Sequence, residues 1–388
     1  MDLAFIAKRL GCVGGTERDL VQLVNGLAAR GHRITVYCSY PDSPVSVACR
    51  RVRVPTLGVG RLAQMWSLAG LGPRLAFQGG HDLATGFARL FRQDVIRCGG
   101  GSHAGYLDTL AATDPFLRRA FRRIHPLHRS ILAIERRQYQ PGRFRRVIAI
   151  SEVVKADLMR VYDVPEARIR VIPDGVDTVR FHPRLREAHR DAIRAVHGIP
   201  VDADVLLFVG NGFRRKGLEP MLRAFARVPD RNGYALVVGD DPDRARYRKL
   251  AVQLGLGSRV IFAGVQSDME KYYGAADCLV LPALQEAFGN VVLEALAAGL
   301  PAVVSAGAGA AETLKAGLAA GLVKDPLDAV ELAGRLQAVL AWARSGEAAG
   351  PARRMAETYS MEAHILRMEA LFQEVLREKQ ACKRLPLP

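Results

Sequence analysis

Two glutamates, Glu286 and Glu294, have a spacing that would allow their carboxylates to bind one ligand together. They are eight residues apart, just over two helical turns, so both carboxylates can lie near one face of a helix that begins around Gly289. Such a pair could hold two separate hydroxyl-bearing groups of one ligand, while N–H groups of the first helical turn face an anion between them. The sugar, diphosphate and ribose of a nucleotide-sugar fit this layout.

A cationic cluster follows the apolar run at 204–210, which we predict to be a strand. The sequence there reads Gly-Asn-Gly-Phe-Arg-Arg-Lys-Gly and includes Arg215 and Lys216. Glycines allow close backbone approach, and two cations at the end of a strand could stabilise a diphosphate leaving group. We therefore assign Arg215 and Lys216 to catalysis, with Arg214 as the weaker candidate. The alternative is a surface turn with solvated basic side chains.

Two further glycine-rich loops follow predicted strands in the first half of the chain. Gly14 and Gly15 lie between a strand at 3–7 and a helix at about 16–30. Their N–H groups could approach a phosphate or an acceptor hydroxyl, and we assign both glycines to donor binding. The loop departs from the dinucleotide-binding Gly-x-Gly-x-x-Gly pattern. The run Gly99–Gly101 precedes His103, which could share the acceptor proton or orient the sugar. The alternatives are a tight turn and a glycine hinge beside a surface histidine.

Strands and helices alternate along the whole chain, which predicts parallel sheets with crossover helices. The two halves share this rhythm, so we expect an α/β protein with two facing Rossmann-like domains and the ligand at the carboxyl ends of the strands. We place the first domain at 1–175 and the second, nucleotide-sugar-binding domain at 176–360. A C-terminal helix and tail at 361–388 could return to the first domain.

Composition limits the class of protein. The 388 residues are 49% hydrophobic, and the six cysteines show no Cys-x-x-Cys spacing, which is typical of a reduced cytosolic protein. The N-terminus lacks the pattern of a signal peptide, and no apolar run is long enough to cross a membrane. The Asp241-Pro242-Asp243 sequence resembles a metal motif, but its position after a strand favours a turn, and we expect no metal.

Positive charge is concentrated in the first half. The net charge is +16, and the segment 118–146 holds a single acid, Glu135. Basic and apolar residues alternate there at helical spacing, which favours a peripheral contact with an anionic membrane over about 106–146. A solvated helix face is the alternative, and no nucleic-acid-binding motif accompanies the charge. The arginines assigned to this membrane or acceptor side are Arg118, Arg119, Arg122, Arg123, Arg136 and Arg137.

Taken together, these motifs resemble the retaining glycosyltransferases of the GT4 type, which have the GT-B fold. The likeness covers nearly the whole chain: the Gly14-Gly15 loop, the Pro-Asp-Gly-Val-Asp sequence at 173–177, the Arg215-Lys216 cluster and the spacing from Glu286 to Glu294. Within the family the chain is similar to the lipopolysaccharide core glucosyltransferases. These share its Gly-Gly-x-x-Arg-Asp, Ala-Arg-Gly-His and Phe-x-Arg-Lys-Gly sequences and a basic membrane-contacting segment.

The resemblance implies a role for each matching residue. Glu286 and His103 join Arg215 and Lys216 as the expected catalytic residues. Glu286 would hold hydroxyls of the donor sugar and Glu294 the ribose, while the N–H groups of Phe288, Gly289 and Asn290 would face the sugar and phosphate. The family further implies retention at the anomeric carbon, a UDP-sugar as donor with glucose as the sugar, and no metal or other cofactor. The expected partners are that donor, a lipopolysaccharide-core or other glycan acceptor and an anionic membrane surface, without nucleic acid. We expect a monomer at the cytoplasmic face of the inner membrane.

One departure concerns the acceptor side. Where the core glucosyltransferases have Ala-Ala-Asp, this chain has Cys98 followed by three glycines, so no carboxylate is present in that run and His103 is the candidate for its role. Two other functions remain open. A nucleotide-sugar epimerase would share the two-domain plan but would need acid and base groups on both faces of the sugar. A membrane-bound adaptor with a vestigial donor site would not bind a UDP-sugar.

Overall fold

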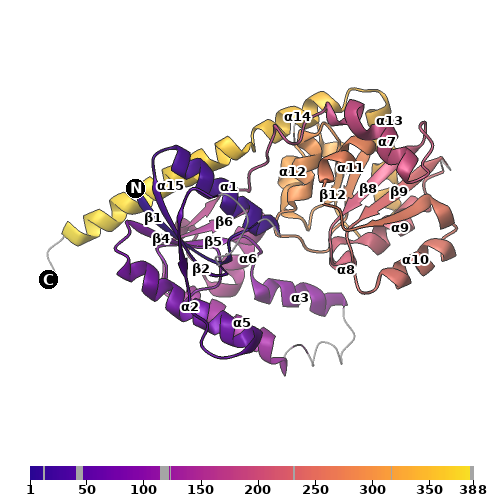
Figure 1. The fold of residues 1–388 in the computed structure, drawn as a ribbon. Coiled ribbons are helices and arrows are strands. Elements are labelled where there is room, and N and C mark those ends of the chain that lie inside the picture. Colours follow the sequence, from indigo (N-terminus) through magenta and orange to yellow (C-terminus); the bar gives the residue numbers. More distant parts are fainter. Residues whose placement is uncertain are drawn as a thin grey trace. The chain divides into compact units, whose positions relative to one another are not determined.

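The protein forms two compact units in this computed structural model (Figure 1). One unit comprises Met1–Gly175 together with the chain from Met361 onward, and the other comprises Val176–Ser360. The residues that the structure describes are 1–11, 14–40, 47–113, 122, 124–229, 232–315 and 317–384.

The N-terminal unit is built on a seven-stranded parallel sheet in the order β3-β2-β1-β4-β5-β6-β7. Its strands are apolar runs rather than alternating patterns, because helices cover both faces of a parallel sheet; Leu3 to Ala7 are all buried. The strands are β1 (Asp2–Arg9), β2 (Arg33–Tyr40), β3 (Arg50–Arg53), β4 (Leu83–Gly86), β5 (Val95–Cys98), β6 (Arg146–Ala149) and β7 (Ile169–Val171).

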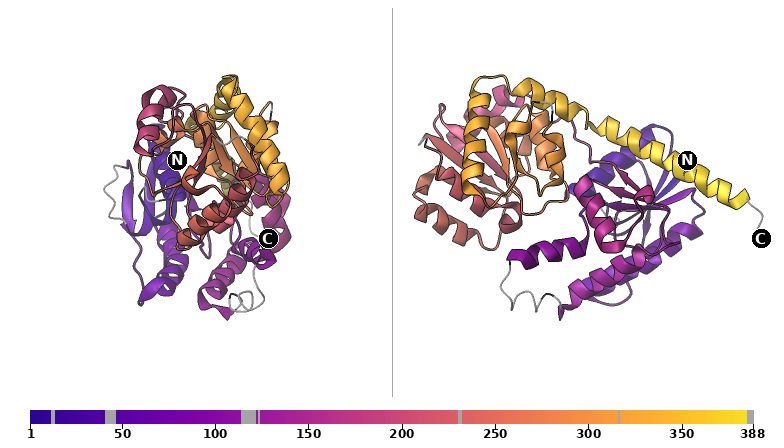
Figure 2. Two further views of the ribbon diagram at one scale, coloured as in Figure 1. Left: turned by 90° about the vertical axis from the view of Figure 1, so that its right-hand side faces the viewer. Right: turned by 180° about the vertical axis from the view of Figure 1, so that it is seen from behind.

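The helices of this unit include the last helix of the chain. It runs along the unit in the right-hand view of Figure 2, and its residues Met368 and Phe372 join the core formed by the first helix and the sheet. Phe372 packs edge-on against Phe5. The helices are α1 (Gly15–Ala29), α2 (Gly60–Gln78), α3 (His103–Thr113), α5 (Pro126–Gln138), α6 (Glu152–Tyr162), the 3-10 turn η1 (Glu166–Arg168) and α15 (Met361–Arg384).

The C-terminal unit has a six-stranded parallel sheet in the order β10-β9-β8-β11-β12-β13. Its strands are β8 (Asp204–Val209), β9 (Gly233–Val238), β10 (Val260–Gly264), β11 (Cys278–Leu281), β12 (Ala302–Ser305) and β13 (Leu322–Val323). Its helices are α7 (Leu185–Val196), α8 (Phe213–Lys216), α9 (Leu218–Phe225), α10 (Arg244–Gln253), α11 (Met269–Ala275), α12 (Asn290–Ala297), α13 (Ala329–Arg344) and α14 (Ala349–Glu357), with 3-10 turns η2 (Gly257–Arg259), η3 (Gly309–Thr313) and η4 (Ala319–Gly321).

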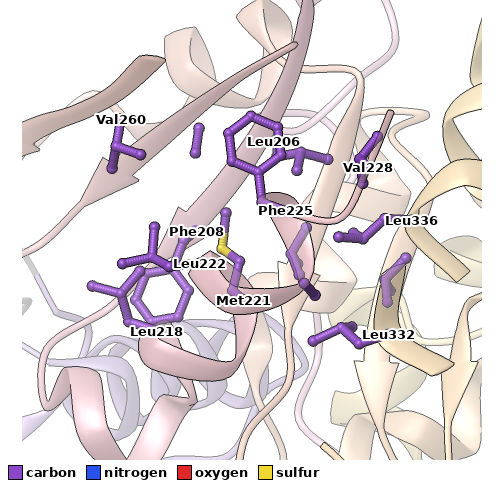
Figure 3. Close-up of a cluster of buried hydrophobic side chains, with 14 of the residues drawn as sticks. Leu206, Phe208, Leu218, Met221, Leu222, Phe225, Val228, Val260, Leu332 and Leu336 are labelled. Carbon is purple, nitrogen blue, oxygen red and sulfur yellow. The ribbon is translucent and has the colours of Figure 1, made fainter. Parts of the chain in front are cut away.

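The core of this unit fills the space between the sheet and the helices α9 and α13. Leu206 and Phe208 from β8 face Met221 and Phe225 of α9, and Leu332 joins them from α13 (Figure 3). All five side chains are essentially inaccessible to water. This packing fixes the end of β8 and the start of α9, and therefore the short basic helix α8 between them.

The predicted fold is confirmed: two Rossmann-like α/β units with parallel sheets. The apolar runs at 3–7, 33–38, 204–210 and 277–281 lie on strands, and the helix expected at 16–30 is α1. Strand β4 and helix α2 were not predicted from the sequence. Among the residues that the structure describes, no helix combines the length and apolar character needed to span a bilayer.

Candidate active site

The basic cluster and Glu286 meet at the centre of the C-terminal sheet. From the central strand β8 the chain continues to β9 on one side, whereas β11 lies on the other side, so the loops after β8 and β11 diverge at this point. Ligands of open α/β sheets bind at such a switch point. Arg215 and Lys216 follow β8 and Glu286 follows β11, so these cations meet a carboxylate that lies 71 and 70 residues away in sequence.

Both cations contact the same carboxylate oxygen. Arg215 Nη1 and Lys216 Nζ each lie 2.9 Å from Glu286 Oε2. Arg215 Nη1 also donates to the Gln285 carbonyl at 2.9 Å, and the Leu284 N–H donates to the Arg215 carbonyl at 2.9 Å. The structure therefore joins three of the residues assigned to catalysis into one ionic cluster.

Glycines make this close packing possible. Gly217 has a φ of +81°, and a Cβ there would lie 1.9 Å from the Pro282 carbonyl oxygen. A Cβ on Gly210, whose φ is +135°, would lie 2.5 Å from Lys216 Cε. A side chain at either position would displace the loop after β11 or Lys216 itself. The glycines flanking the cluster thus bring its backbone and side chains into contact.

The cluster favours an ionised Glu286. Burial of this side chain opposes ionisation, but the charges of Lys216 and Arg215 outweigh it and hold the pKa of Glu286 below its usual value. The site contains two cations against one carboxylate, so it has an excess positive charge. Such an excess suits an anionic ligand.

The loop after Glu286 leads directly into α12. The Glu286 N–H donates to the Gly307 carbonyl, and the Ala310 N–H donates to the carbonyl of the buried Phe288. Gly289 caps the helix with a φ of +104°, which a residue with a side chain would adopt only under strain. The first-turn N–H groups of a helix have no intrahelical acceptor, so the turn that begins at Asn290 can bind an acidic group.

Glu294 is separated from the cation cluster by more than a turn of α12. Its Oε2 accepts a hydrogen bond of 2.6 Å from the Tyr273 hydroxyl, and the Tyr273 ring packs edge-on against Phe181. Glu286 and Glu294 therefore have different partners: Glu286 contacts Arg215 and Lys216, whereas Glu294 accepts a hydrogen bond from Tyr273. This is the separation expected if each carboxylate binds a different part of one ligand.

The Asp241-Pro242-Asp243 sequence forms a turn at the start of α10. Asp241 Oδ2 accepts the Phe213 N–H at 2.8 Å, and Asp241 Oδ1 accepts the Asp243 N–H at 2.8 Å. Its first carboxylate therefore fixes the start of α8 and its own turn. Among the described residues, no group of three acidic, histidine or cysteine side chains is arranged to hold a metal ion.

A pocket of about 200 Å³ lies at the corresponding switch point of the N-terminal unit. It is bordered by the start of α1, the loops after β4 and β5, and one face of α5. Gly14 and Gly15 lie beside it at the start of α1, where the Gly14 N–H donates to Glu17 Oε2 at 3.1 Å. The lining residues are Thr16, Phe87, Ala88, Arg89, Arg97, Cys98, Gly99, Gly100, Gly101, Glu135, Gln138 and Tyr139.

His103 is the first residue of α3, beyond the glycine run, and is largely buried. Its Nε2 lies 2.9 Å from His128 Nδ1, and the two rings stack with their centroids 5.1 Å apart. Burial, followed by the nearby charges of Arg89 and His128, lowers the pKa of His103 to about 4. The neutral imidazole is therefore the form present near pH 7.

Glu135 was not assigned to the site from the sequence, yet it lies in this pocket. Its carboxylate accepts hydrogen bonds from Arg89 Nε (2.6 Å), the His103 N–H (3.0 Å) and the Tyr162 hydroxyl (2.5 Å). No carboxylate is present in the run 98–101, but the fold supplies this one from α5. The sequence feature that could have identified Glu135 is that it is the one acid in 118–146, at a helical position beside the apolar Ile134.

A second buried ionic group, which was not predicted from the sequence, borders the pocket through Arg97. Arg97 Nη2 lies 2.7 Å from Asp19 Oδ2 and also contacts Asp174 Oδ1, and His364 Nε2 lies 3.5 Å from Asp19 Oδ1. A Cβ on Gly99 would lie 2.1 Å from Arg97 Nη1, so this glycine makes room for the guanidinium. Burial raises the pKa of Asp19 despite the neighbouring Arg97.

The basic segment 106–146 comprises α3, α5 and the chain between and after them. Arg118, Arg119 and Arg123 lie outside the described residues. Arg136 and Arg137 are exposed on α5, and the Arg137 guanidinium stacks over the Phe91 ring at 4.4 Å. Arg122 is half-buried. Pro126 begins α5, a position where its missing N–H costs nothing.

The fold and the cation–carboxylate cluster define a two-domain α/β protein of the GT-B type, and comparison with known proteins identifies its family. Residues 13–180 match the model described as Glycosyltransferase Family 4, and residues 189–354 match the model described as Glycosyl transferases group 1. A probable transglycosylase of Burkholderia thailandensis is 31% identical over 377 residues, 95% of each chain. The protein belongs to the GT4-type glycosyltransferases and is an enzyme of that class.

Two further proteins are similar to this chain. The lipopolysaccharide glucosyltransferase WaaG of Escherichia coli K12 is 29% identical over 340 residues, 86% of this chain and 87% of that one. The crystal structure of WaaG superimposes with a TM-score of 0.77 at 26% identity, covering 95% of this chain and 99% of that one. The Anabaena protein HepE in complex with UDP and glucose shares the fold, with a TM-score of 0.71 and 17% identity over 96% of this chain and 100% of that one. The likeness to a lipopolysaccharide core glucosyltransferase, expected from the sequence, is confirmed.

Proposed function

We propose that this glycosyltransferase moves a hexose, glucose in the first instance, from a UDP-sugar to a lipopolysaccharide-core or other glycolipid acceptor at the cytoplasmic face of the inner membrane. We further propose that transfer retains the anomeric configuration and requires no metal. The main support for the proposal is the Arg215–Lys216–Glu286 cluster at the switch point of the C-terminal sheet.

The cluster supplies what a departing nucleoside diphosphate needs. When the bond between the anomeric carbon and the β-phosphate oxygen breaks, negative charge accumulates on that oxygen. Arg215 and Lys216 are positioned to stabilise this charge, and fixed charges aimed at developing charge are a large part of enzymatic rate enhancement. The acceptor oxygen then forms its bond on the same face of the sugar, and its proton passes to the departing phosphate oxygen.

The remaining groups hold the ends of the donor. Displaced from its cations by the diphosphate, Glu286 can accept hydrogen bonds from the sugar hydroxyls. Glu294, which already accepts a hydroxyl from Tyr273, is suited to bind the ribose hydroxyls. The N–H groups of Phe288, Gly289 and Asn290 near the α12 N-terminus would face the sugar and the phosphates.

The choice of donor and acceptor follows the relatives. WaaG is a lipopolysaccharide glucosyltransferase by name, and HepE holds UDP and glucose in its structure. On the acceptor side we assign a catalytic role to His103 and contacts with the acceptor or membrane to the six arginines named in the sequence analysis. The Gly14-Gly15 loop would contribute to donor binding. The neutral state of His103 suits a hydrogen bond with a sugar hydroxyl better than ion pairing with a phosphate.

A transfer screen tests this function. Purified protein is incubated with UDP-, ADP- and GDP-sugars and truncated lipid A core acceptors, and products are identified by mass spectrometry. The configuration of the new glycosidic bond is read by NMR. We expect transfer from UDP-glucose with retention. Formation of a free epimerised sugar nucleotide without acceptor would favour an epimerase, and undetectable binding of every donor would favour the adaptor.

A further inference from the structure

The pocket of the N-terminal unit contains hydrogen-bond donors that have no partner among the residues that the structure describes. It lies where the loops after the neighbouring strands β4 and β5 meet the start of α1 and one face of α5 (Figure 1). Three sets of donors line it: the glycine run 99–101, the guanidinium of Arg97 and the guanidinium of Arg89. Such donors could bind a group of a ligand other than the nucleotide-sugar.

The glycine run has unpaired backbone N–H groups. In the described part of the chain, the N–H groups of Gly99, Gly100 and Gly101 donate no hydrogen bond to the protein. Gly101 is buried and has a φ of +71°. Buried N–H groups without a partner are rare in native proteins. Successive N–H groups in a turn that includes a residue with positive φ can form a concave anion-binding site, so the run has the features of such a site.

Arg97 adds two further unpaired donors. Its side chain is 1% exposed, and its Nη2 contacts both Asp19 and Asp174. Its Nε and Nη1 have no hydrogen-bond partner among the described residues. Nη1 lies beside the glycine run, because a Cβ on Gly99 would be 2.1 Å from it. A buried charged donor without a partner is costly, so an acceptor atom of a ligand would stabilise this arrangement.

Arg89 brings a second cation to the pocket from the loop after β4. Its Nε donates to Glu135 at 2.6 Å, whereas its Nη1 and Nη2 make no hydrogen bond to any residue that the structure describes. The side chain is 38% exposed. Glu135 therefore holds the guanidinium in place and leaves two of its nitrogens able to donate to a ligand. A guanidinium held in this way suits bidentate binding of a phosphate or a carboxylate.

The carboxylates around the pocket are already engaged. Glu135 is the one acidic side chain among the described residues that line it, and this carboxylate also accepts hydrogen bonds from the His103 N–H and the Tyr162 hydroxyl. Behind Arg97, burial raises the pKa of Asp19, which favours its protonated form and reduces the negative charge there. Unpaired donors beside engaged carboxylates favour a ligand group that only accepts hydrogen bonds, as ionised phosphate and carboxylate do.

We propose that this pocket binds a phosphate or carboxylate group carried by the acceptor, with Arg89, Arg97 and the glycine run as the residues that determine this specificity. The inference rests on the proposed function, because it assigns the anionic group to the acceptor of that transfer. The pocket volume of about 200 Å³ is sufficient for one such group and part of the sugar that carries it.

Substitution of Gly100 tests the charge preference. A Cβ there meets no atom within 4 Å, so a side chain fits. Gly100→Asp places a carboxylate beside the donors, and Gly100→Asn is the matched control because it has the same shape without the charge. The calorimetric probes are glucose 6-phosphate, glucuronate and glucose, which differ in the group at carbon 6. We expect the wild type to bind one anionic probe at least about tenfold more tightly than glucose. Gly100→Asn should keep most of this preference, and Gly100→Asp should lose it.

Two further titrations locate the bound anion. Lys216→Ala removes a cation from the donor site and should leave the preference for the anionic probe intact, and Gly100→Asp should bind UDP as tightly as the wild type does. Absence of the preference in the wild type, its loss in Lys216→Ala, or an equal loss in Gly100→Asn would overturn the proposal. A fall in UDP affinity in Gly100→Asp as large as the fall in probe affinity would also contradict it, by assigning the pocket to the donor diphosphate.

Transfer measurements separate this inference from the proposed function. With a water-soluble acceptor that carries the preferred anionic group, Gly100→Asp should raise the KM for the acceptor about tenfold or more and leave the KM for the donor unchanged. If no donor and acceptor give transfer but the titrations follow the expected pattern, the proposed function fails and the anion pocket stands. If acceptors with and without the anionic group are used with equal kcat/KM, the anion pocket fails and the proposed function stands.

Discussion

Replacement of Lys216 by alanine is the substitution that tests the donor site most sharply. Lys216 Nζ lies 2.9 Å from Glu286 Oε2, in the position from which we expect it to contact the departing diphosphate. Removal of one charged donor from such a site typically reduces turnover by two to three orders of magnitude, about 3–4 kcal/mol of transition-state stabilisation. We therefore expect kcat to fall about 100- to 1000-fold in Lys216→Ala, and equally in Arg215→Ala.

The structure also predicts that Lys216→Ala remains folded. Glu286 keeps its contact with Arg215 Nη1 at 2.9 Å, so no unpaired charge is left buried. The free energy of unfolding should therefore fall by no more than about 1–2 kcal/mol. Because Lys216 contributes to lowering the pKa of Glu286, that pKa should rise in the variant.

The assay measures transfer from UDP-glucose, or hydrolysis of the donor, under saturating substrate. Arg214→Ala is the matched control, because it removes the same amount of charge from the same short helix at the position that we judge the weaker candidate. Near-normal turnover in Lys216→Ala would refute the assignment. A loss in Arg214→Ala as large as that in Lys216→Ala would show that general positive charge, rather than this geometry, matters.

Three further predictions concern backbone strain, protonation and metal. Gly217 has a φ of +81°, and the Cβ of Gly217→Ala would lie 1.9 Å from the Pro282 carbonyl oxygen, so this variant should lower the free energy of unfolding, measured by urea titration, by about 3 kcal/mol or more. Gly142 has a φ of +78° but open space around it, so Gly142→Ala should lower the free energy of unfolding by only about 1 kcal/mol. Because the pKa of His103 is lowered to about 4, its neutral form stabilises the fold above the unfolded value near 6.5. This contribution, at most about 3 kcal/mol, is lost as the pH falls from 6.5 towards 4. His103→Gln should flatten that part of the stability profile, and an unchanged profile would contradict the assignment. Transfer should persist in excess chelator, whereas a loss restored by Mg²⁺ or Mn²⁺ would show that a metal takes part.

Much of the fold could be predicted because parallel strands buried on both faces appear as short apolar runs. β1 and β8 were visible for that reason, and the glycine after each marked a loop. β4 was missed because it has four residues and includes a threonine and a glycine. α2 was missed because it contains glycines and Pro73, and because its apolar residues do not follow a strict helical period.

The candidate site was predictable only in part, for a related reason. Glu286 and Glu294 are close in sequence, and Arg215 with Lys216 forms a local cluster, so their chemistry can be read from spacing. The pairing of Arg215 and Lys216 with Glu286 depends on the order of β8 and β11 in the sheet, which spacing does not encode. Glu135 is the clearest example, because its partners come from three other segments of the chain.

Calorimetric titration with UDP and UMP most directly tests the claim that the Arg215–Lys216–Glu286 cluster binds the donor diphosphate. UDP carries the second phosphate that the two cations would contact, and UMP lacks it. We predict that the wild type binds UDP at least about tenfold more tightly than UMP and that Lys216→Ala removes most of this difference. Equal binding of UDP and UMP by the wild type, or an undiminished preference for UDP in Lys216→Ala, would contradict the account.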